Sequence, residues 1–209
     1  RAAFAERRPV DEYVDARFKE LMHRSRISGG MPDAVRAFVD TDDVSSVRVA
    51  QNAIVEQYRY DIAKYAGNQA RVVKRIFDLI PSEVSRQNKR FVARDIEGDS
   101  HIDRYENDFM WLVDANVAIP VYNVDEPRYP LKSSMRSRFF KLFQSDVGLL
   151  TYQMGMDVVR QMLGSRPYIN FGSIYENFVS QELLAHGLDP YYFKNRTVGE
   201  LDFVVQWPF

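Results

Sequence analysis

The sequence contains no cysteine and only three histidines among its 209 residues. A disulfide framework and a thiolate metal site are therefore excluded, and three scattered histidines make a poor zinc site. No apolar run approaches the roughly 20 residues needed to cross a bilayer, and no signal peptide opens the chain. From these absences we expect a soluble, cytoplasmic protein that makes no membrane contact.

Two sequence patterns that support catalysis elsewhere are also missing. No glycine is followed by lysine, so the phosphate loop G-x-x-x-x-G-K-[ST] is absent. Without its backbone amides and its lysine, the chain lacks the usual means of holding ATP. None of the seven lysines has an acid two positions before it, so there is no Glu-x-Lys pair. We expect this chain to bind no cofactor and to be catalytically inactive by itself.

Excess charge of one sign is missing as well, because the net charge is −1. Any nucleic-acid contact must therefore come from local basic patches. Residues 71–94 hold seven Lys/Arg and two acids, and residues 128–141 hold five Lys/Arg and no acid. DNA contact, protein contact and a simple solvated face all remain open as explanations of these stretches.

The 45% hydrophobic content is enough for packed cores. The elements that the sequence pattern predicts make the fold α+β and mainly helical. Hydrophobic periodicity predicts three helices in residues 1–66, with a break at Gly29-Gly30 and a restart at Pro32. For residues 67–137 the pattern predicts helices, an extended stretch and the start of a two-stranded ribbon: helices 70–80, 82–88 and 101–115, extended residues 90–96, and strands 117–124 and 138–143. That order is typical of a winged helix.

Residues 138–209 end in an amphipathic helix (173–187), a short strand (191–194) and the strand Gly199-Glu200-Leu201-Asp202-Phe203-Val204-Val205. Alternation places Glu200 and Asp202 on one face of the last strand and Phe203 on the other. An aspartate within so apolar a run must be exposed, hydrogen-bonded or bound to a cation. A hydrogen-bonded carboxylate at a strand end is the simpler interpretation of Asp202.

Four stretches in this order resemble a known family: G-G-M-P-D-A-V (29–35), Y-R-Y-D-I-A-K-Y (58–65), K-L-F-Q-S-D-V-G-L-L (141–150), and E-N-F (176–178) with G-E-L-D-F (199–203). Together they are similar to the rear half of prokaryotic archaeal-type AAA ATPases that carry a PD-(D/E)XK nuclease-like C-terminal domain. The resemblance implies a helical lid (1–66), a winged helix (67–137) and a truncated restriction-endonuclease-like α/β unit (138–209).

The resemblance also implies functional residues. Glu176 and Asp202 would be catalytic acids and metal ligands. Their site would be incomplete, because the Glu-x-Lys pair that the family carries on its next strand is missing here. Two close carboxylates need a basic partner or a raised pKa, and Lys194 and Arg196 are the nearest candidates in sequence. Arg36 would be a nucleotide sensor, with a structural helix restart as the alternative. DNA contacts are expected from six residues near the third helix and the wing: Arg90, Arg94, Arg104, Lys132, Arg136 and Arg138.

In the full-length protein, the resemblance implies ATP and Mg²⁺ as cofactors. The expected partners are DNA and a P-loop module upstream in the same polypeptide, and a homo-oligomer is left open. The expected function is DNA binding or DNA processing. The alternative is a protein-interaction or regulatory module whose nuclease-like fold is catalytically dead.

Overall fold

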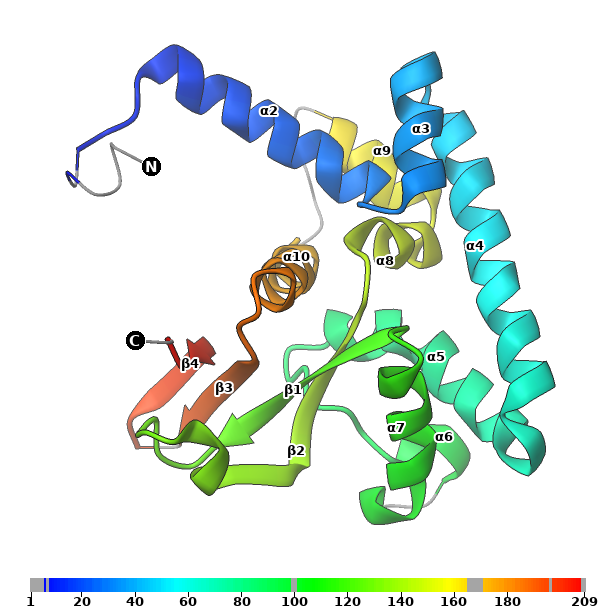
Figure 1. Ribbon diagram of the computed structural model, residues 1–209, viewed down its shortest axis with the longest axis vertical. Helices are drawn as coiled ribbons and strands as arrows, with labels where there is room; N and C mark the ends of the chain where they lie inside the picture. The colour runs from blue at the N-terminus through cyan, green and yellow to red at the C-terminus, as the bar shows by residue number, and fades with distance from the viewer. Residues whose placement is uncertain (1–5, 7, 99–100, 165–170, 196, 208–209) are drawn as a thin grey trace.

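A computed structural model of the chain describes residues 6, 8–98, 101–164, 171–195 and 197–207. In it, helices pack around one four-stranded sheet, so the fold is mixed α/β (Figure 1). Within these residues, no helix is long and apolar enough to span a membrane.

The N-terminal part is helical, as the sequence predicts. Its helices are α2 (Glu12–Ser28), α3 (Pro32–Thr41) and α4 (Val44–Tyr65). Asp11 caps α2 by accepting a hydrogen bond from the Tyr13 amide at 3.0 Å. The break falls at Gly29, whose φ of 72° is a conformation that glycine adopts without strain.

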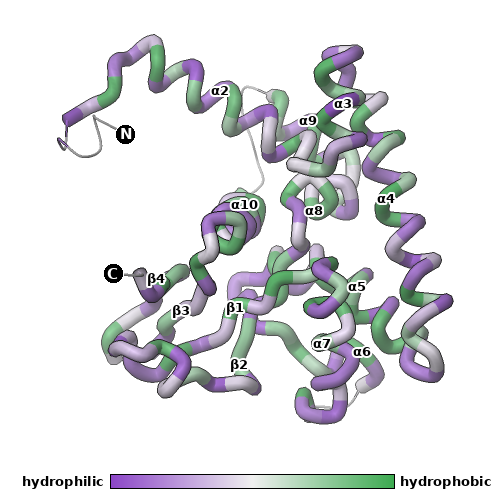
Figure 2. Tube along the Cα trace, in the orientation of Figure 1, coloured by the Kyte–Doolittle hydropathy of each residue, from purple (hydrophilic) through white to green (hydrophobic). Residues whose placement is uncertain are grey.

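The apolar residues of α2 do not form a core. Tyr13 is 80% exposed and Phe18 is 60% exposed, and Leu21 and Met22 are exposed as well. In Figure 1, the first turns of α2 reach away from the sheet, and Figure 2 shows hydrophobic and hydrophilic residues mixed along them. Only the last turn, Arg26 to Ser28, is buried.

The following helices are η1 (Gly67–Gln69), α5 (Ala70–Ser85), α6 (Arg94–Glu97), η2 (Ile102–Tyr105) and α7 (Glu106–Asp114). The expected helix end at Pro81 is wrong, because α5 continues through it. Proline removes one helical hydrogen bond. However, Ile80 and Val84 are fully buried on either side, and this packing holds the helix together. The stretch expected to be extended, residues 90–96, instead ends in α6.

The sheet contains β1 (Ala118–Val124), β2 (Met135–Gln144), β3 (Pro190–Asn195) and β4 (Gly199–Val205), in the order β2-β1-β3-β4. The short helix η3 (Leu131–Ser134) precedes β2. β1 pairs with β2 antiparallel and with β3 parallel, and β4 pairs with β3 antiparallel. The expected ribbon therefore belongs to a larger sheet, and the expected domain boundary at residue 137 falls inside β2.

Helices cover both faces of this sheet. Phe140 of β2 contacts Phe91 and Phe109 on one face, with ring centroids 6.3 and 4.9 Å away. Lys141, the next residue, points to the other face, where α10 (Gly172–Ala185) lies. The expected helix over residues 149–163 is divided by Gly155 into α8 (Val147–Met154) and α9 (Met156–Leu163). Gly155 has a φ of 98°, which ends α8.

Asp146, directly before α8, joins the N-terminal helices to the rest of the molecule. Its buried carboxylate accepts hydrogen bonds from the Gly30 amide at 2.6 Å and from the Leu149 amide at 3.0 Å. A Cβ on Gly29 would lie 2.1 Å from Asp146, and a Cβ on Gly148 would lie 2.5 Å from the Gly29 nitrogen. The two backbone segments therefore meet at a distance that only glycine permits.

We predict that Gly148→Ala lowers the free energy of unfolding by about 1–3 kcal/mol or more, because the new methyl group overlaps the backbone of Ser28 and Gly29. Gly30→Ala is the matched control, since its Cβ would meet only side-chain atoms at 3.6 and 3.7 Å. That change should cost less than about 0.5 kcal/mol. Urea unfolding of both variants measures the difference, and equal losses would contradict the close approach.

A second buried carboxylate, Glu83 near the end of α5, lies beside charged neighbours. Burial raises the pKa of Glu83 to about 7, and the adjacent Asp95 adds to this effect. The Val92 amide, which donates to Glu83 at 2.8 Å, and the Arg86 guanidinium at 2.9 Å act in the opposite direction. Glu83 is therefore largely protonated below neutral pH.

Between pH 4.5 and 7 the folded chain holds a proton on Glu83 that the unfolded chain has released, so this residue makes stability fall as pH rises. Glu83→Gln should remove that fall, which amounts to at most about 3 kcal/mol at roughly 1.4 kcal/mol per pKa unit. Thermal melts at pH 5 and pH 8 measure it. Exposed Glu56→Gln serves as the control and should leave the pH dependence as in the parent chain.

Candidate functional site: a carboxylate–lysine centre beside a basic cavity

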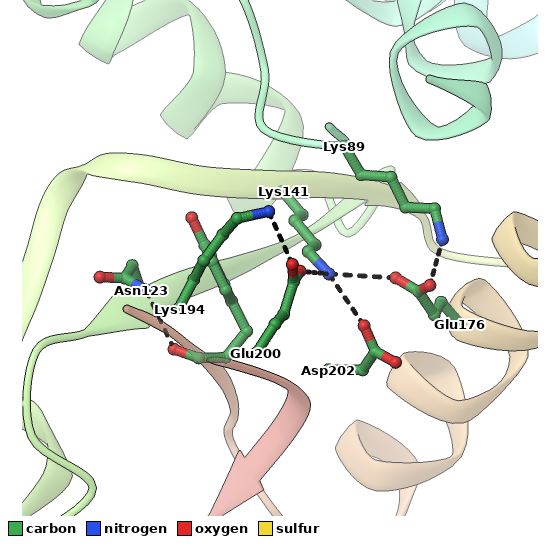
Figure 3. A network of polar contacts seen from close by, with 8 residues as sticks. Lys89, Asn123, Lys141, Glu176, Lys194, Glu200 and Asp202 are labelled. Carbon is green, nitrogen blue, oxygen red and sulfur yellow. Dashed lines mark hydrogen bonds and ion pairs between the residues drawn. The ribbon is translucent and has the colours of Figure 1, made fainter. Parts of the chain in front are cut away.

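Three carboxylates from two elements surround the ammonium group of Lys141 (Figure 3). Its Nζ lies 3.1 Å from Glu176 Oε2, 3.4 Å from Asp202 Oδ1 and 3.5 Å from Glu200 Oε1. The Lys141 side chain is only 4% exposed, whereas Asp202 is 58% exposed. The centre therefore has a buried cation and an open acidic side.

The structure brings Glu176 and Asp202 together, as expected from the sequence. Each lies within 3.4 Å of the same nitrogen, so their oxygens are no more than about twice that distance apart. The basic partner differs from the expected one. Lys141, far upstream in β2, contacts both acids, while Lys194 contacts Glu200 at 2.6 Å. Arg196 lies outside the described residues.

Alternation along β4 places Glu200 and Asp202 together on the face of Lys141, and a β-bulge directly after them changes the face of Phe203. Tyr191 pairs with Val204 and Phe193 pairs with Leu201, so Tyr192 alone faces both Asp202 and Phe203. A bulge interrupts the alternation of side chains along a strand. Phe203 therefore packs near Phe143, two residues from Lys141 on β2, on the same side of the sheet as Asp202. The prediction that Glu200 and Asp202 share a face agrees with these contacts, and the prediction that Phe203 lies on the opposite face is wrong.

Asn177 fixes the position of Glu176. Its side-chain oxygen accepts from the Gln144 amide at 2.8 Å, and its nitrogen donates to the Gln144 carbonyl at 3.0 Å. Asn177 is fully buried, so this pair of hydrogen bonds ties α10 to the end of β2. Glu176, the preceding residue, is thereby held over Lys141. Lys89, in the loop after α5, contacts the other oxygen of Glu176.

The electrostatics of the centre are balanced by lysine. Burial alone raises the pKa of Glu200, but the Lys194 hydrogen bond and the charges of Lys141 and Lys194 outweigh it, and the pKa lies below its usual value. Three acids and three lysines form the network, in which Lys89, Glu176, Lys141, Glu200 and Lys194 follow one another and Asp202 branches from Lys141. The formal charges cancel.

The carboxylates do not fit a divalent metal as they are arranged. Their oxygens are the ligand type that Mg²⁺ prefers. However, the Lys141 ammonium lies among them, and among the described residues no group of three His, Asp or Glu side chains is placed to hold a metal ion. Lysine provides the neutralising charge that a metal ion would otherwise provide.

A basic cavity of about 380 Å³ lies next to this centre. Its cations are Arg90, Arg136 and Lys194 and its acid is Asp125, and the remaining lining residues are Asn88, Asn123, Phe139 and Tyr192. Lys194 joins the two sites, because it lines the cavity and also contacts Glu200. Burial raises the pKa of Tyr192 to about 12, so its hydroxyl stays neutral.

The other residues predicted from the sequence lie elsewhere. Arg94 begins α6, Arg104 lies in η2, and Lys132 in η3 lines a different cavity. Arg138 contacts Asp103 at 2.7 Å, and Arg36 lies exposed on α3. Of the six expected DNA contacts, the structure places only Arg90 and Arg136 in one cavity.

Sequence reasoning missed Lys141, Glu200 and Lys89 as members of the centre. For Lys141 a signal existed, because a lysine inside the apolar run Phe139-Phe140-Lys141-Leu142-Phe143 needs a buried partner. For Glu200 the signal was its position two residues before Asp202, because residues two apart in a strand lie on the same face. Lys89 carries no such signal, since it comes from a loop brought near only by the fold.

The sequence profile of a domain of unknown function (DUF8612) matches residues 19–159, about two thirds of the chain. The chain belongs to this family. The matched segment includes Lys89 and Lys141 but ends before Glu176, Glu200 and Asp202. Searches of curated proteins and of solved structures found no match.

We predict that Lys141→Met destabilises the chain by up to about 3 kcal/mol, because breaking a buried ion pair leaves charges uncompensated. Millimolar Mn²⁺ should then restore part of the stability of this variant, because in the folded state it replaces the Lys141 charge beside Asp202 and beside the two acids that Lys89 and Lys194 still contact. The parent chain should show little response to Mn²⁺. Thermal melts with and without the ion measure both effects.

The double variant Lys141→Met/Asp202→Asn is the control. With one carboxylate removed, the Mn²⁺ response should be largely abolished. A parent chain that Mn²⁺ stabilises as strongly as Lys141→Met would show that the ammonium does not replace a metal.

Proposed function

We propose that this chain is the rear part of a prokaryotic AAA-type ATPase that acts on DNA. Residues 1–66 would be its lid, and the winged-helix part (from residue 67) and the nuclease-like part (to residue 209) would share one sheet, because their expected boundary at residue 137 lies within β2. The chain by itself binds DNA and cleaves neither DNA nor ATP. In the full-length protein, an upstream P-loop module would supply ATP and Mg²⁺ chemistry.

The observation that carries this proposal is the adjacency of the basic cavity and the carboxylate–lysine centre. Arg90 and Arg136, two residues proposed to contact DNA, line a cavity that also contains Lys194. Lys194 in turn contacts Glu200 of the centre. Cations arranged beside a set of acids favour a ligand that carries phosphate, because the cations attract it and the acids limit where it sits.

We predict weak, salt-sensitive DNA binding in which Arg136 takes part. Arg136→Glu should weaken duplex binding and reduce the slope of log affinity against log salt by roughly 0.9 for each phosphate that the protein no longer neutralises. Arg128→Glu makes the same charge change at an exposed position in the β1–β2 connection and should change both quantities much less. Fluorescence anisotropy across a salt series measures them.

A second function is favoured by one separate observation, the exposed apolar face of α2. Tyr13, Phe18, Leu21 and Met22 are exposed on this helix. Contiguous exposed apolar side chains often mark a protein-binding surface. A protein-interaction module with an inactive nuclease-like fold would use this face. The two functions separate in one measurement, because absence of DNA binding at about 50 mM salt favours the interaction module.

A further inference from the structure

Arg90 differs from the other two cations of the basic cavity. Within the part of the chain that the structure describes, its guanidinium forms no ion pair and no side-chain hydrogen bond, and it stacks on Phe139 with Cζ 3.7 Å from the ring centre. By contrast, Arg136 contacts Asp125 at 2.5 Å and Lys194 contacts Glu200 at 2.6 Å. Arg90 is therefore the cation of this cavity that is left to bind an external group.

This arrangement favours an anion. Burial lowers the pKa of Arg90, so the cavity disfavours the charged form while none of the described residues in its wall neutralises it. Guanidinium carries five N–H donors in a planar fork that matches the oxygens of phosphate, and stacking on an aromatic ring leaves the edge of that fork free. An anion in the cavity would satisfy these donors and replace the solvation that burial removes.

The charge and size of the cavity limit which class of ligand can bind in it. Its three cations and the two acids that contact them, Asp125 and Glu200, leave a formal charge of one positive unit. A phosphodiester carries one negative charge and matches it. The volume of about 380 Å³ lies within the range of about 300–1,000 Å³ found for small-ligand sites, which leaves room for more than a phosphate group. The amides of Asn88 and Asn123 lie in the same wall.

We infer that this cavity binds one backbone phosphodiester of a nucleic-acid strand, with Arg90 as its main ligand and Arg136 and Lys194 at its rim. This inference rests on the proposed function and names the contact through which the strand is held beside the carboxylate–lysine centre. Asp202, the most exposed acid of the centre, repels phosphate, so the strand is directed toward the Arg90 side.

The test compares binding of a short single-stranded DNA oligonucleotide to the chain and to Arg90→Met, by fluorescence anisotropy. Methionine keeps an apolar stem over Phe139 and removes the charge. Affinity should fall about tenfold or more, as when a charge-assisted hydrogen bond is removed, and the salt slope should fall by roughly 0.7. Arg71→Met, at an exposed position on α5, is the matched control and should stay close to the parent chain.

Arg90→Lys is the second variant, and it keeps the proposal testable if Arg90→Met unfolds. It preserves the charge but loses the planar fork, so its affinity should lie below that of the parent chain with the salt slope retained. Inorganic phosphate and a free mononucleotide are titrated by calorimetry in parallel, to separate the sources of phosphate.

The outcomes distinguish this inference from the function on which it rests. Oligonucleotide binding that Arg90→Met and Arg90→Lys leave unchanged overturns the cavity assignment while the DNA-binding function stands. Arg90-dependent binding of phosphate or mononucleotide without oligonucleotide binding overturns the DNA-binding function and the strand as the source of the phosphate. Absence of all binding overturns both. Arg90-dependent oligonucleotide binding supports both.

Discussion

The contact of Asp146 with the Gly29–Gly30 backbone is the constraint on which the arrangement of this molecule depends. A carboxylate at the start of α8 accepts hydrogen bonds from the Gly30 and Leu149 amides, and thereby caps one helix while holding the end of another. Burial raises the pKa of Asp146, and the backbone amides oppose that rise. Because α8 packs against α2, α4 and α10, this junction sets how the N-terminal helices lie relative to the sheet.

The Asp146 junction also determines which charged side chains meet on the face of the sheet. β2 leads directly into Asp146, and Asn177 binds the backbone at the last residue of β2. The position of α10, and with it Glu176, is therefore fixed from two sides. The desolvation cost of burying Lys141 is offset by Glu176 and the acids of β4, which are held close to its ammonium group. The centre is thus a product of the junction rather than of any single strand.

The sequence predicted the parts of the fold that local rules control. Asp11, Pro32 and the Gly29-Gly30 break place the N-terminal helices correctly, and alternation places β3 and β4. The prediction failed where packing between distant segments determines the structure. The helix α5 continues through Pro81, and β1 pairs with β3 as well as with β2.

In the candidate site, too, the sequence predicted the features that depend on local motifs and missed those that depend on long-range packing. Glu176 and Asp202 were found because their motifs are local. Lys141 was counted only as part of the basic stretch 128–141, since its role depends on a helix and a strand that come later in the chain. Alternation placed Asp202 with Glu200, but the bulge that brings Phe203 to the same face leaves no pattern that alternation can detect.

The end of α2 has a further consequence for the centre. Arg26 is buried and lies over the ring of Tyr175, with Cζ 4.2 Å from the ring centre. Tyr175 precedes Glu176 on α10, so the exposed helix and the carboxylate–lysine centre share one contact. A partner of α2 that displaced Arg26 would remove the side chain that stacks on the residue before Glu176. If that displacement changed the free energy of the centre, a ligand at the centre would change the affinity of α2 for the partner by the same factor. The Arg26–Tyr175 stack is the contact through which such coupling would act.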